Sequence, residues 1–263
     1  MNLTGSRVLL TGATGGLGHA IARTLAESGA ELVLTGRRAD VLEALSADIG
    51  GQVLAADLGS RPALEELVAA AGRIDIVVAN AALPASGPLL DFDLDRIDRC
   101  LEVNLRAPIV LARILAPDMV ARGRGHFCFI SSLSGLSATS GTSIYSATKF
   151  GLRGFAHGLR QDLHGTGVGA SVVLPGFIRD AGMFADSEAR LPAGVRTSSP
   201  SQVADAVRRS IVKDKAELIV APREVHAGAL LGGLAPGLAA RVTRRLGGDR
   251  VADEIAAGQR DKS

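Results

Sequence analysis

The sequence has few of the residues that mark several other classes of protein. Tryptophan is absent, Tyr145 is the only tyrosine, and the two cysteines, Cys100 and Cys128, do not suggest a disulfide framework. No apolar run approaches the roughly 18 residues of a membrane span. Lys and Arg (29) nearly balance Asp and Glu (27), so the charge gives no sign of nucleic-acid binding.

The N-terminus shows no targeting pattern. Its first residues lead directly into Val8-Leu9-Leu10, which is too short for the apolar core of a signal peptide. Together with the low cysteine content, this predicts a cytoplasmic protein. No residue is assigned to a metal.

Short β-rich runs alternate with helical patterns along the 263 residues. We expect seven strands, at Arg7–Thr11, Glu31–Thr35, Gln52–Ala56, Ile74–Ala79, His126–Ser131, Gly169–Leu174 and Glu217–Val220. We expect helices at Leu17–Ser28, Ala39–Ile49, Arg61–Ala71, Asp95–Arg122, Tyr145–His164 and Ser201–Lys213. This alternation predicts an α/β fold with a single doubly wound parallel sheet of about seven strands and helices on both faces, which is Rossmann-like.

A glycine-rich turn follows the first expected strand and opens the first expected helix. Glycines at such a junction let backbone N–H groups approach a pyrophosphate, and the N-terminus of the helix adds partial positive charge. The turn therefore predicts a dinucleotide site, formed by Gly12, Thr14, Gly15, Gly16, Leu17 and Gly18.

The single tyrosine lies close to residues with which it can do proton chemistry. Lys149 follows Tyr145 by four positions, so a helix places both side chains on one face. Ser132 comes shortly after the apolar run that ends at Ile130. A free phenol titrates near 10, and a neighbouring ammonium lowers that pKa. We expect Tyr145, with a pKa well under 10, to exchange a proton with a substrate oxygen that Ser132 orients.

Taken together, these motifs resemble those of a classical short-chain dehydrogenase/reductase. The glycine turn, Asp57-Leu58, Asn80-Ala81, Pro175-Gly176 and the tyrosine–lysine pair all stand where that family has its motifs. The resemblance runs from about Arg7 to Val220. It implies a catalytic tetrad of Asn104, Ser132, Tyr145 and Lys149, of which Ser132 and Tyr145 also contact the substrate.

The same resemblance implies how the residues divide their work on a nicotinamide cofactor. Tyr145 would donate or accept the proton, Lys149 would lower its pKa and hold the nicotinamide ribose, and the backbone of Asn104 would support a water chain to Lys149. Further cofactor contacts would come from Asp57, Leu58, Asn80, Ala81, Tyr145, Lys149, Pro175, Gly176 and Ile178. Residues 1–222 would then form the cofactor-binding and catalytic domain, with residues 223–263 as a C-terminal helical tail of the same domain.

One feature fits two branches of the family, and another departs from the family pattern. Gly12, Gly15 and Gly18 also fit the spacing of its extended branch, which includes sugar epimerases, but the chain after Val220 is too short for that branch's substrate domain. Asp180 stands where the family often has a threonine that touches the cofactor. Because a carboxylate would repel a pyrophosphate, we expect Asp180 either to cap a helix beginning at Ala181 or to pair with Arg179.

The end of the second strand predicts which cofactor is preferred. An acidic residue there would bind the ribose hydroxyls of NAD, whereas an arginine accommodates the 2′-phosphate of NADP. The sequence reads Thr35-Gly36-Arg37-Arg38, with no carboxylate before Asp40. We expect NADP(H) to be preferred, with Arg37 as the main contact and Arg38 as the second, and NAD(H) to remain possible.

The substrate and the partners are less defined. The segment 178–197, with Met183, Phe184 and Leu191, predicts a lid over a lipophilic small-molecule carbonyl or alcohol.

Helices 95–122 and 145–164 predict a homodimer or homotetramer, because the second carries Phe150, Phe155 and Leu159. The tail from Val225 to Ala240 is apolar but broken by Gly232-Gly233 and by Pro236, and arginines follow it. It could cover the active site, seal an oligomer, lie weakly on a membrane surface or pack on its own domain. An epimerase or dehydratase of the same fold, or a silent NADP-sensing regulator, remains the alternative function.

Overall fold

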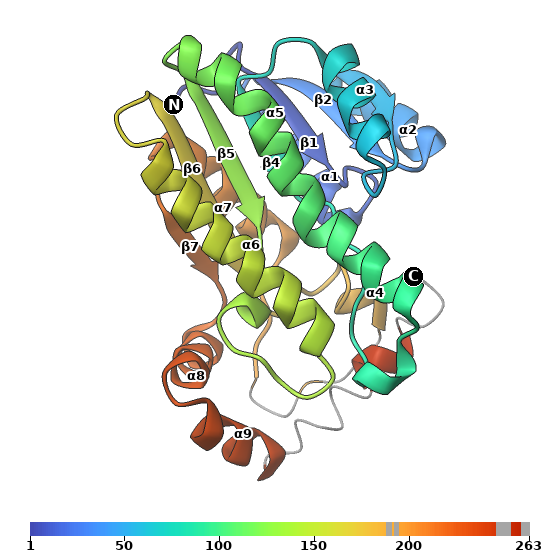
Figure 1. Ribbon diagram of the computed structural model, residues 1–263, viewed down its shortest axis with the longest axis vertical. Coiled ribbons are helices and arrows are strands. Elements are labelled where there is room, and N and C mark those ends of the chain that lie inside the picture. Colours follow the sequence, from blue (N-terminus) through green and yellow to red (C-terminus); the bar gives the residue numbers. More distant parts are fainter. Residues whose placement is uncertain (188–190, 192–194, 246–253, 259–263) are drawn as a thin grey trace.

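Seven parallel strands form one sheet in the order β3-β2-β1-β4-β5-β6-β7 (Figure 1). The structure is a computed structural model that describes residues 1–187, 191, 195–245 and 254–258. The strands are β1 (Arg7–Thr11), β2 (Glu31–Gly36), β3 (Gln52–Ala55), β4 (Ile76–Ala79), β5 (Gly125–Ile130), β6 (Val168–Pro175) and β7 (Glu217–Val220). The expected strands are confirmed to within two residues at each end. Chain order reverses between β1 and β4, which creates a crevice at the carboxyl ends of the strands.

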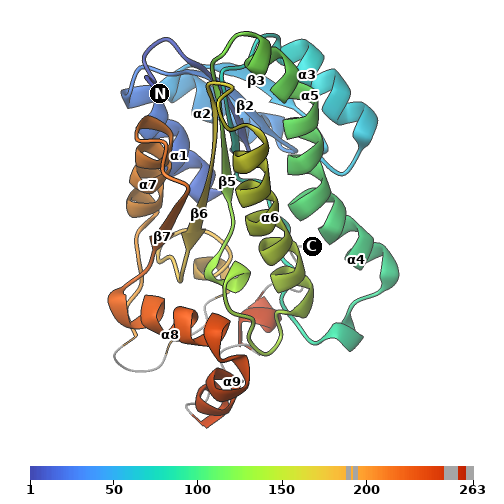
Figure 2. The same cartoon turned by 60° about the vertical axis from the view of Figure 1, so that its left-hand side comes forward.

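Helices cover both faces of the sheet (Figure 2). The apolar side chains of α1 (Gly16–Glu27), α2 (Ala39–Ile49) and α7 (Pro200–Val212) form one buried cluster with one face of the strands. Those of α3 (Arg61–Ala71), α5 (Ala107–Ala121) and α6 (Ser143–Asp162) form a second cluster on the other face. The doubly wound architecture predicted from the alternation of strands and helices is therefore confirmed.

The helix expected over 95–122 is not uniform. It consists of α4 (Leu94–Leu101), a π-helical segment over Glu102–Arg106, and α5. π-Helical turns are rare and often lie at functional sites. This one contains Asn104, whose side chain bonds to the loop after β4 rather than to its own helix.

The C-terminal tail forms two helices, α8 (Arg223–Leu234) and α9 (Pro236–Arg245), and residues 246–253 and 259–263 lie outside the described part. Gly232 and Gly233 stay helical, and the break falls at Ala235. Proline disfavours a helical conformation in the residue before it and is well suited to the first turn of the next helix. Pro236, rather than the glycine pair, therefore divides the tail.

Two of the three apolar residues that suggested an oligomer interface on α6 turn inward. Phe155 packs edge-to-face on Phe129, with ring centroids 5.5 Å apart, and Leu159 packs against the same core cluster. Phe150 alone of the three is exposed, at 42%. Self-association through α4, α5 and α6 stays a prediction that now depends on fewer apolar contacts.

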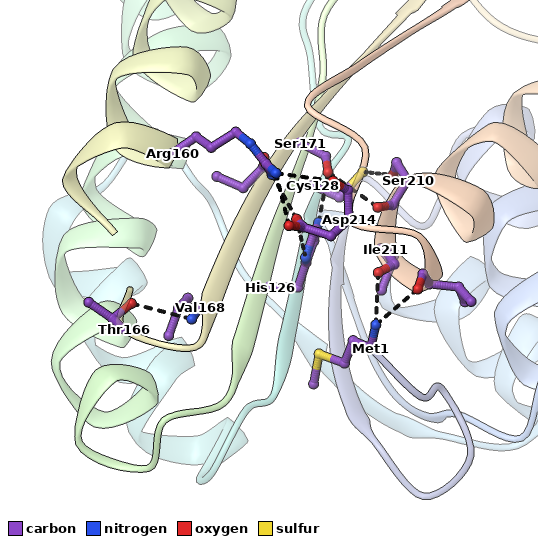
Figure 3. Close-up of polar contacts among 12 residues, drawn as sticks. Met1, His126, Cys128, Arg160, Thr166, Val168, Ser171, Ser210, Ile211 and Asp214 are labelled. Carbon is purple, nitrogen blue, oxygen red and sulfur yellow. Dashed lines mark hydrogen bonds and ion pairs between the residues drawn. The ribbon is translucent and has the colours of Figure 1, made fainter. Parts of the chain in front are cut away.

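A polar network joins the buried His126 of β5 and Ser171 of β6 to the exposed Asp214 (Figure 3). His126 Nε2 and Ser171 Oγ are 2.8 Å apart, and Ser171 Oγ donates to the carbonyl of Ser210 at 3.4 Å. Asp214 lies 3.9 Å from His126 Nδ1 and forms an ion pair with Arg160. Burial lowers the pKa of His126 from 6.5 to about 4, although Asp214 opposes this shift. The imidazole is therefore neutral in the native protein.

This network predicts a pH-dependent stability. Between pH 6.5 and 4 the unfolded chain binds a proton at His126 that the native state does not, so stability falls as the pH is lowered through this window. The contribution amounts to roughly 3 kcal/mol of unfolding free energy. Urea titrations across this window should show the loss in the wild type and in His164→Gln, which changes an exposed histidine, but not in His126→Gln. Equal pH dependence in all three proteins would contradict the prediction.

Candidate active site

A cavity of about 1100 Å³ opens at the carboxyl ends of the strands. Its lining includes residues that end or directly follow β1, β2, β4, β5 and β6: Gly12, Gly36, Asn80, Ile130 and Pro175. Because the strands are parallel, these ends meet at one edge of the sheet. The cavity therefore collects side chains that are far apart in the sequence.

The glycine turn forms one end of the cavity. Gly12 has φ +65°, and a Cβ atom there would lie 2.7 Å from the Cα of Ala81. A Cβ atom on Gly18 would lie 2.2 Å from the carbonyl oxygen of Gly12. α1 begins at Gly16 without a side-chain cap, so the N–H groups of its first turn are available to an anion. The turn thus has the shape and polarity that suit a pyrophosphate.

Hydrogen bonds from Asn80 hold the glycine turn in place. Its side-chain amide donates to the carbonyls of Thr11 and Gly12 at 3.1 and 3.0 Å, and the N–H groups of Asn80 and Ala81 both donate to Thr11 Oγ1 at 3.0 Å. The side-chain N–H groups of Asn80 are therefore already used in hydrogen bonds within the protein. Asn80 and Ala81 line the cavity as expected, but the Asn80 side chain positions the turn.

The two arginines after β2 differ in their surroundings. Arg38 donates to the carbonyl of Thr14 at 2.7 Å and so braces the glycine turn. Arg37 is exposed, lines the same cavity and makes no hydrogen bond to another described residue. The structure therefore leaves Arg37 free for a ligand, whereas Arg38 already has a partner.

Asp57 has a partner that sequence reasoning missed. Arg99, on α4, donates to its carboxylate, and the N–H of Gly59 donates to the same oxygen at 3.0 Å. A Cβ atom on Gly59 would overlap the Arg99 guanidinium, so glycine makes room for it. The bond from Arg99 is the main cause of the lowered pKa of Asp57. Arg99 and Asp57 line the cavity together, beside the buried Leu58.

Ser132, Tyr145 and Lys149 all line the cavity. Lys149 Nζ lies 5.6 Å from the centroid of the Tyr145 ring and donates to the carbonyl of Ile130 at 2.9 Å. Ser132 Oγ accepts the N–H of Ser134 at 3.1 Å, which leaves the serine proton for another acceptor.

The expected direction of the Tyr145 pKa is wrong. Burial raises the pKa of Tyr145 to about 12, and the hydrogen bond with Ser132 only partly opposes it. Burial also lowers the pKa of Lys149 to about 8. Lys149 is therefore neutral at the pH where the phenol ionises and lends no positive charge to the phenolate there. The phenol consequently keeps its proton throughout the physiological range.

Asn104 is 1% exposed and does not reach the cavity with its side chain. Its Oδ1 accepts the N–H of Leu83 at 2.6 Å, and its Nδ2 donates to the carbonyl of Leu83 at 3.0 Å. The side chain therefore fixes the loop after β4. The backbone role that the family resemblance implied for Asn104 stays a prediction.

The remaining end of the cavity is mostly apolar. Pro175, Gly176, Ile178, Met183 and Phe184 line it as expected, and the rings of Phe177 and Phe184 lie 5.1 Å apart. Leu191 also lines it, whereas residues 188–190 and 192–194 of the expected lid lie outside the described part.

Asp180 does not cap a helix. It has φ +66°, no helix begins at Ala181, and its carboxylate lies 3.4 Å from Arg179 Nε. The ion pair, which was the second of the two expectations, is the one found. Ala181 and Gly182 line the cavity, whereas Asp180 is not among its lining residues.

Several lining residues were not named from the sequence, although a tail that covers the site was one of the alternatives. Val225, Gly228, Ala229, Ala239 and Ala240 come from α8 and α9, and Ile255 comes from the short helical segment over 254–258. A run of hydroxyl side chains also faces the cavity between β5 and α6, at Ser134, Ser137, Thr139, Ser140 and Thr142. The density of serine and threonine in this stretch was the one signal in the sequence that could have indicated it.

Comparisons with known proteins identify the family. The family model described as short chain dehydrogenase matches residues 6–191. Ketoacyl reductase HetN of Nostoc sp. is 38% identical over 228 residues, which cover 83% of this chain and 79% of that protein.

Comparisons with solved structures indicate the same family. One titled short chain dehydrogenase/reductase family protein has a TM-score of 0.77 at 32% identity and covers 84% of this chain and 97% of that one. A metagenomic short-chain oxidoreductase in complex with NADP has a TM-score of 0.69 at 33% identity, with coverage of 84% and 99%. The chain therefore belongs to the short-chain dehydrogenase/reductase family of oxidoreductases.

Proposed function

We propose that this protein transfers a hydride between NADP(H) and the carbonyl or alcohol group of a neutral, lipophilic substrate. The observation that carries the proposal is the convergence of Ser132, Tyr145 and Lys149 on the cavity that also contains the glycine turn. At about 1100 Å³ the cavity has room for two ligands side by side.

The cofactor end fits a dinucleotide. The close approaches at Gly12 and Gly18 and the uncapped start of α1 suit the pyrophosphate, and Arg37 suits a 2′-phosphate. Asp57, held by Arg99, would accept a hydrogen bond from the adenine. A related oxidoreductase was solved with NADP, which supports this choice. NAD(H) could occupy the same site with weaker binding.

When bound, the nicotinamide supplies or accepts the hydride, and the chain's own residues manage the proton. In the reductive direction Tyr145 Oη donates its proton to the carbonyl oxygen, which Ser132 Oγ–H orients. Because burial keeps the phenol protonated, Tyr145 is ready to act as the acid. Lys149, protonated below a pH of about 8, would stabilise the phenolate that remains.

The substrate class follows from where the charges lie. Four of the five charged side chains that line the described cavity are Arg37, Arg38, Asp57 and Arg99, all at the cofactor end, and the fifth is Lys149. The other end presents Met183, Phe184 and Val225 beside the row of hydroxyl groups. We therefore propose a neutral apolar chain or ring bearing a ketone or secondary alcohol. The activity in the name of the Nostoc relative, ketoacyl reduction, falls within this class.

Tyr145→Phe should lower the rate of ketone reduction by about 100-fold or more, because loss of a general acid typically costs that much. NADPH oxidation at about 340 nm across a ketone panel measures the rate, and the fluorescence of bound NADPH reports whether the fold and the cofactor site survive. Ser132→Ala should lower kcat less. Full activity in Tyr145→Phe would contradict the mechanism. Tight NADPH binding with no turnover of any ketone by the wild type would favour a silent regulator instead.

The cofactor preference can be tested with the two arginines as a matched pair. Arg37→Ala should lower kcat/KM for NADPH by about 10- to 100-fold and leave NADH almost unchanged, because a charge-assisted bond to the 2′-phosphate is lost. Arg38→Ala should weaken both cofactors, because Arg38 braces the glycine turn through Thr14. Equal loss for both cofactors in Arg37→Ala, or better use of NADH by the wild type, would contradict this assignment.

A further inference from the structure

Five large apolar side chains lie exposed together on the C-terminal helices. They are Leu230, Leu231 and Leu234 on α8, and Leu238 and Val242 on α9, with Leu234 exposed at 86%. We call these five residues the α8–α9 patch. Figures 1 and 2 both show α8 and α9 beyond the end of the sheet, with α9 the farther of the two. Leu230 and Leu234 on α8, and Leu238 and Val242 on α9, are four residues apart, so each pair lies on one face of its helix. Exposed apolar groups gathered on a helix face mark an interaction surface.

The patch is not required for packing of the helices on their own domain. The opposite side of α8 packs on the domain. Gly232 lies against Ser137 and Gly233 against Leu136, and a Cβ atom on either glycine would clash with its neighbour. Val225 and Ala229 of α8, and Ala239 of α9, line the cavity. The two helices thus have one side on the active site and leave the leucines for another partner.

The charges around the patch indicate what that partner is. Residues 225–245 contain no Asp or Glu, and α9 carries Arg241, Arg244 and Arg245. Exposed leucines elsewhere have the opposite setting: Leu89, Leu90 and Leu94 are interleaved with Asp91, Asp93 and Asp95. An apolar face with a cationic end suits the boundary between acyl chains and anionic headgroups. An apolar face interleaved with carboxylates does not, because anionic headgroups repel it.

We propose that the α8–α9 patch docks the protein on an anionic membrane surface. The leucines enter the headgroup boundary, and the exposed Arg241 lies among the phosphates. No described helix is long and apolar enough to span a bilayer, so the association is peripheral and reversible. Because α8 and α9 also line the cavity, docking would bring the apolar end of the active site close to a source of lipophilic substrate. This last consequence rests on the proposed function, but the docking itself does not.

Sedimentation of the full chain with vesicles tests the proposal. We expect binding to phosphatidylcholine vesicles that contain phosphatidylglycerol, weaker binding at high salt, and little binding to phosphatidylcholine alone. Leu234→Glu/Leu238→Glu should lower the partition into anionic vesicles by about tenfold or more, because two apolar groups are lost and two negative charges gained. Neither residue lines the cavity, so NADPH binding should be unchanged and serves as the test of folding.

Leu90→Glu/Leu94→Glu is the matched control, since both leucines are exposed, at 96% and 78%, and the same charges are introduced. It should bind anionic vesicles like the wild type. Failure of the wild type to bind them, or equal losses in the two double variants, would overturn the proposal. A wild type that ignores vesicles but dissociates in light scattering when Leu234 and Leu238 are changed would show instead that the patch joins two copies of the chain.

Discussion

The active site depends on how one buried lysine is held. Lys149 is 2% exposed, and its ammonium donates to the carbonyl of Ile130 at the end of β5. Directly after β5, the hydroxyl of Ser131 donates to the main-chain carbonyl of Lys149 at 2.9 Å. These two bonds fasten α6 to the carboxyl end of β5. They thereby place Tyr145, one helical turn before Lys149, beside Ser132.

Burial of the site has a cost and a chemical consequence. An ionised group loses free energy of solvation when it is buried, so burial favours the neutral forms of both the lysine and the phenol. The pKa of Lys149 falls to about 8 and that of Tyr145 rises to about 12. The resting site therefore holds a protonated phenol ready to donate. A ligand that brings positive charge into the cavity would shift the balance toward phenolate, as the oxidative direction requires.

Much of the fold, and the grouping of the candidate site residues, could be predicted because the signals are local. The alternation of strands and helices predicted the sheet, and the spacing of Tyr145 and Lys149 predicted their common face. What failed depends on tertiary structure. The bond between Arg99 and Asp57 joins residues 42 positions apart. The pKa of Tyr145 depends on burial, which the spacing of residues does not reveal. The sequence offered both Gly232-Gly233 and Pro236 as breaks in the tail, and only the structure shows that the helix continues through the glycines and ends before the proline.

The most direct test of the account is a titration of the single tyrosine by ultraviolet absorbance near 295 nm. With no tryptophan and one tyrosine, the signal belongs to Tyr145 alone. In the cofactor-free protein, with circular dichroism confirming the fold, the phenol should ionise well above its ordinary value of about 10. It should do so equally in Lys149→Met, because Lys149 is already neutral at that pH. Saturation with NADP⁺ should lower the pKa, since the cationic nicotinamide shares the cavity. A tyrosine that titrates near 10 and ignores NADP⁺ would contradict the placement of Tyr145 at the reaction centre.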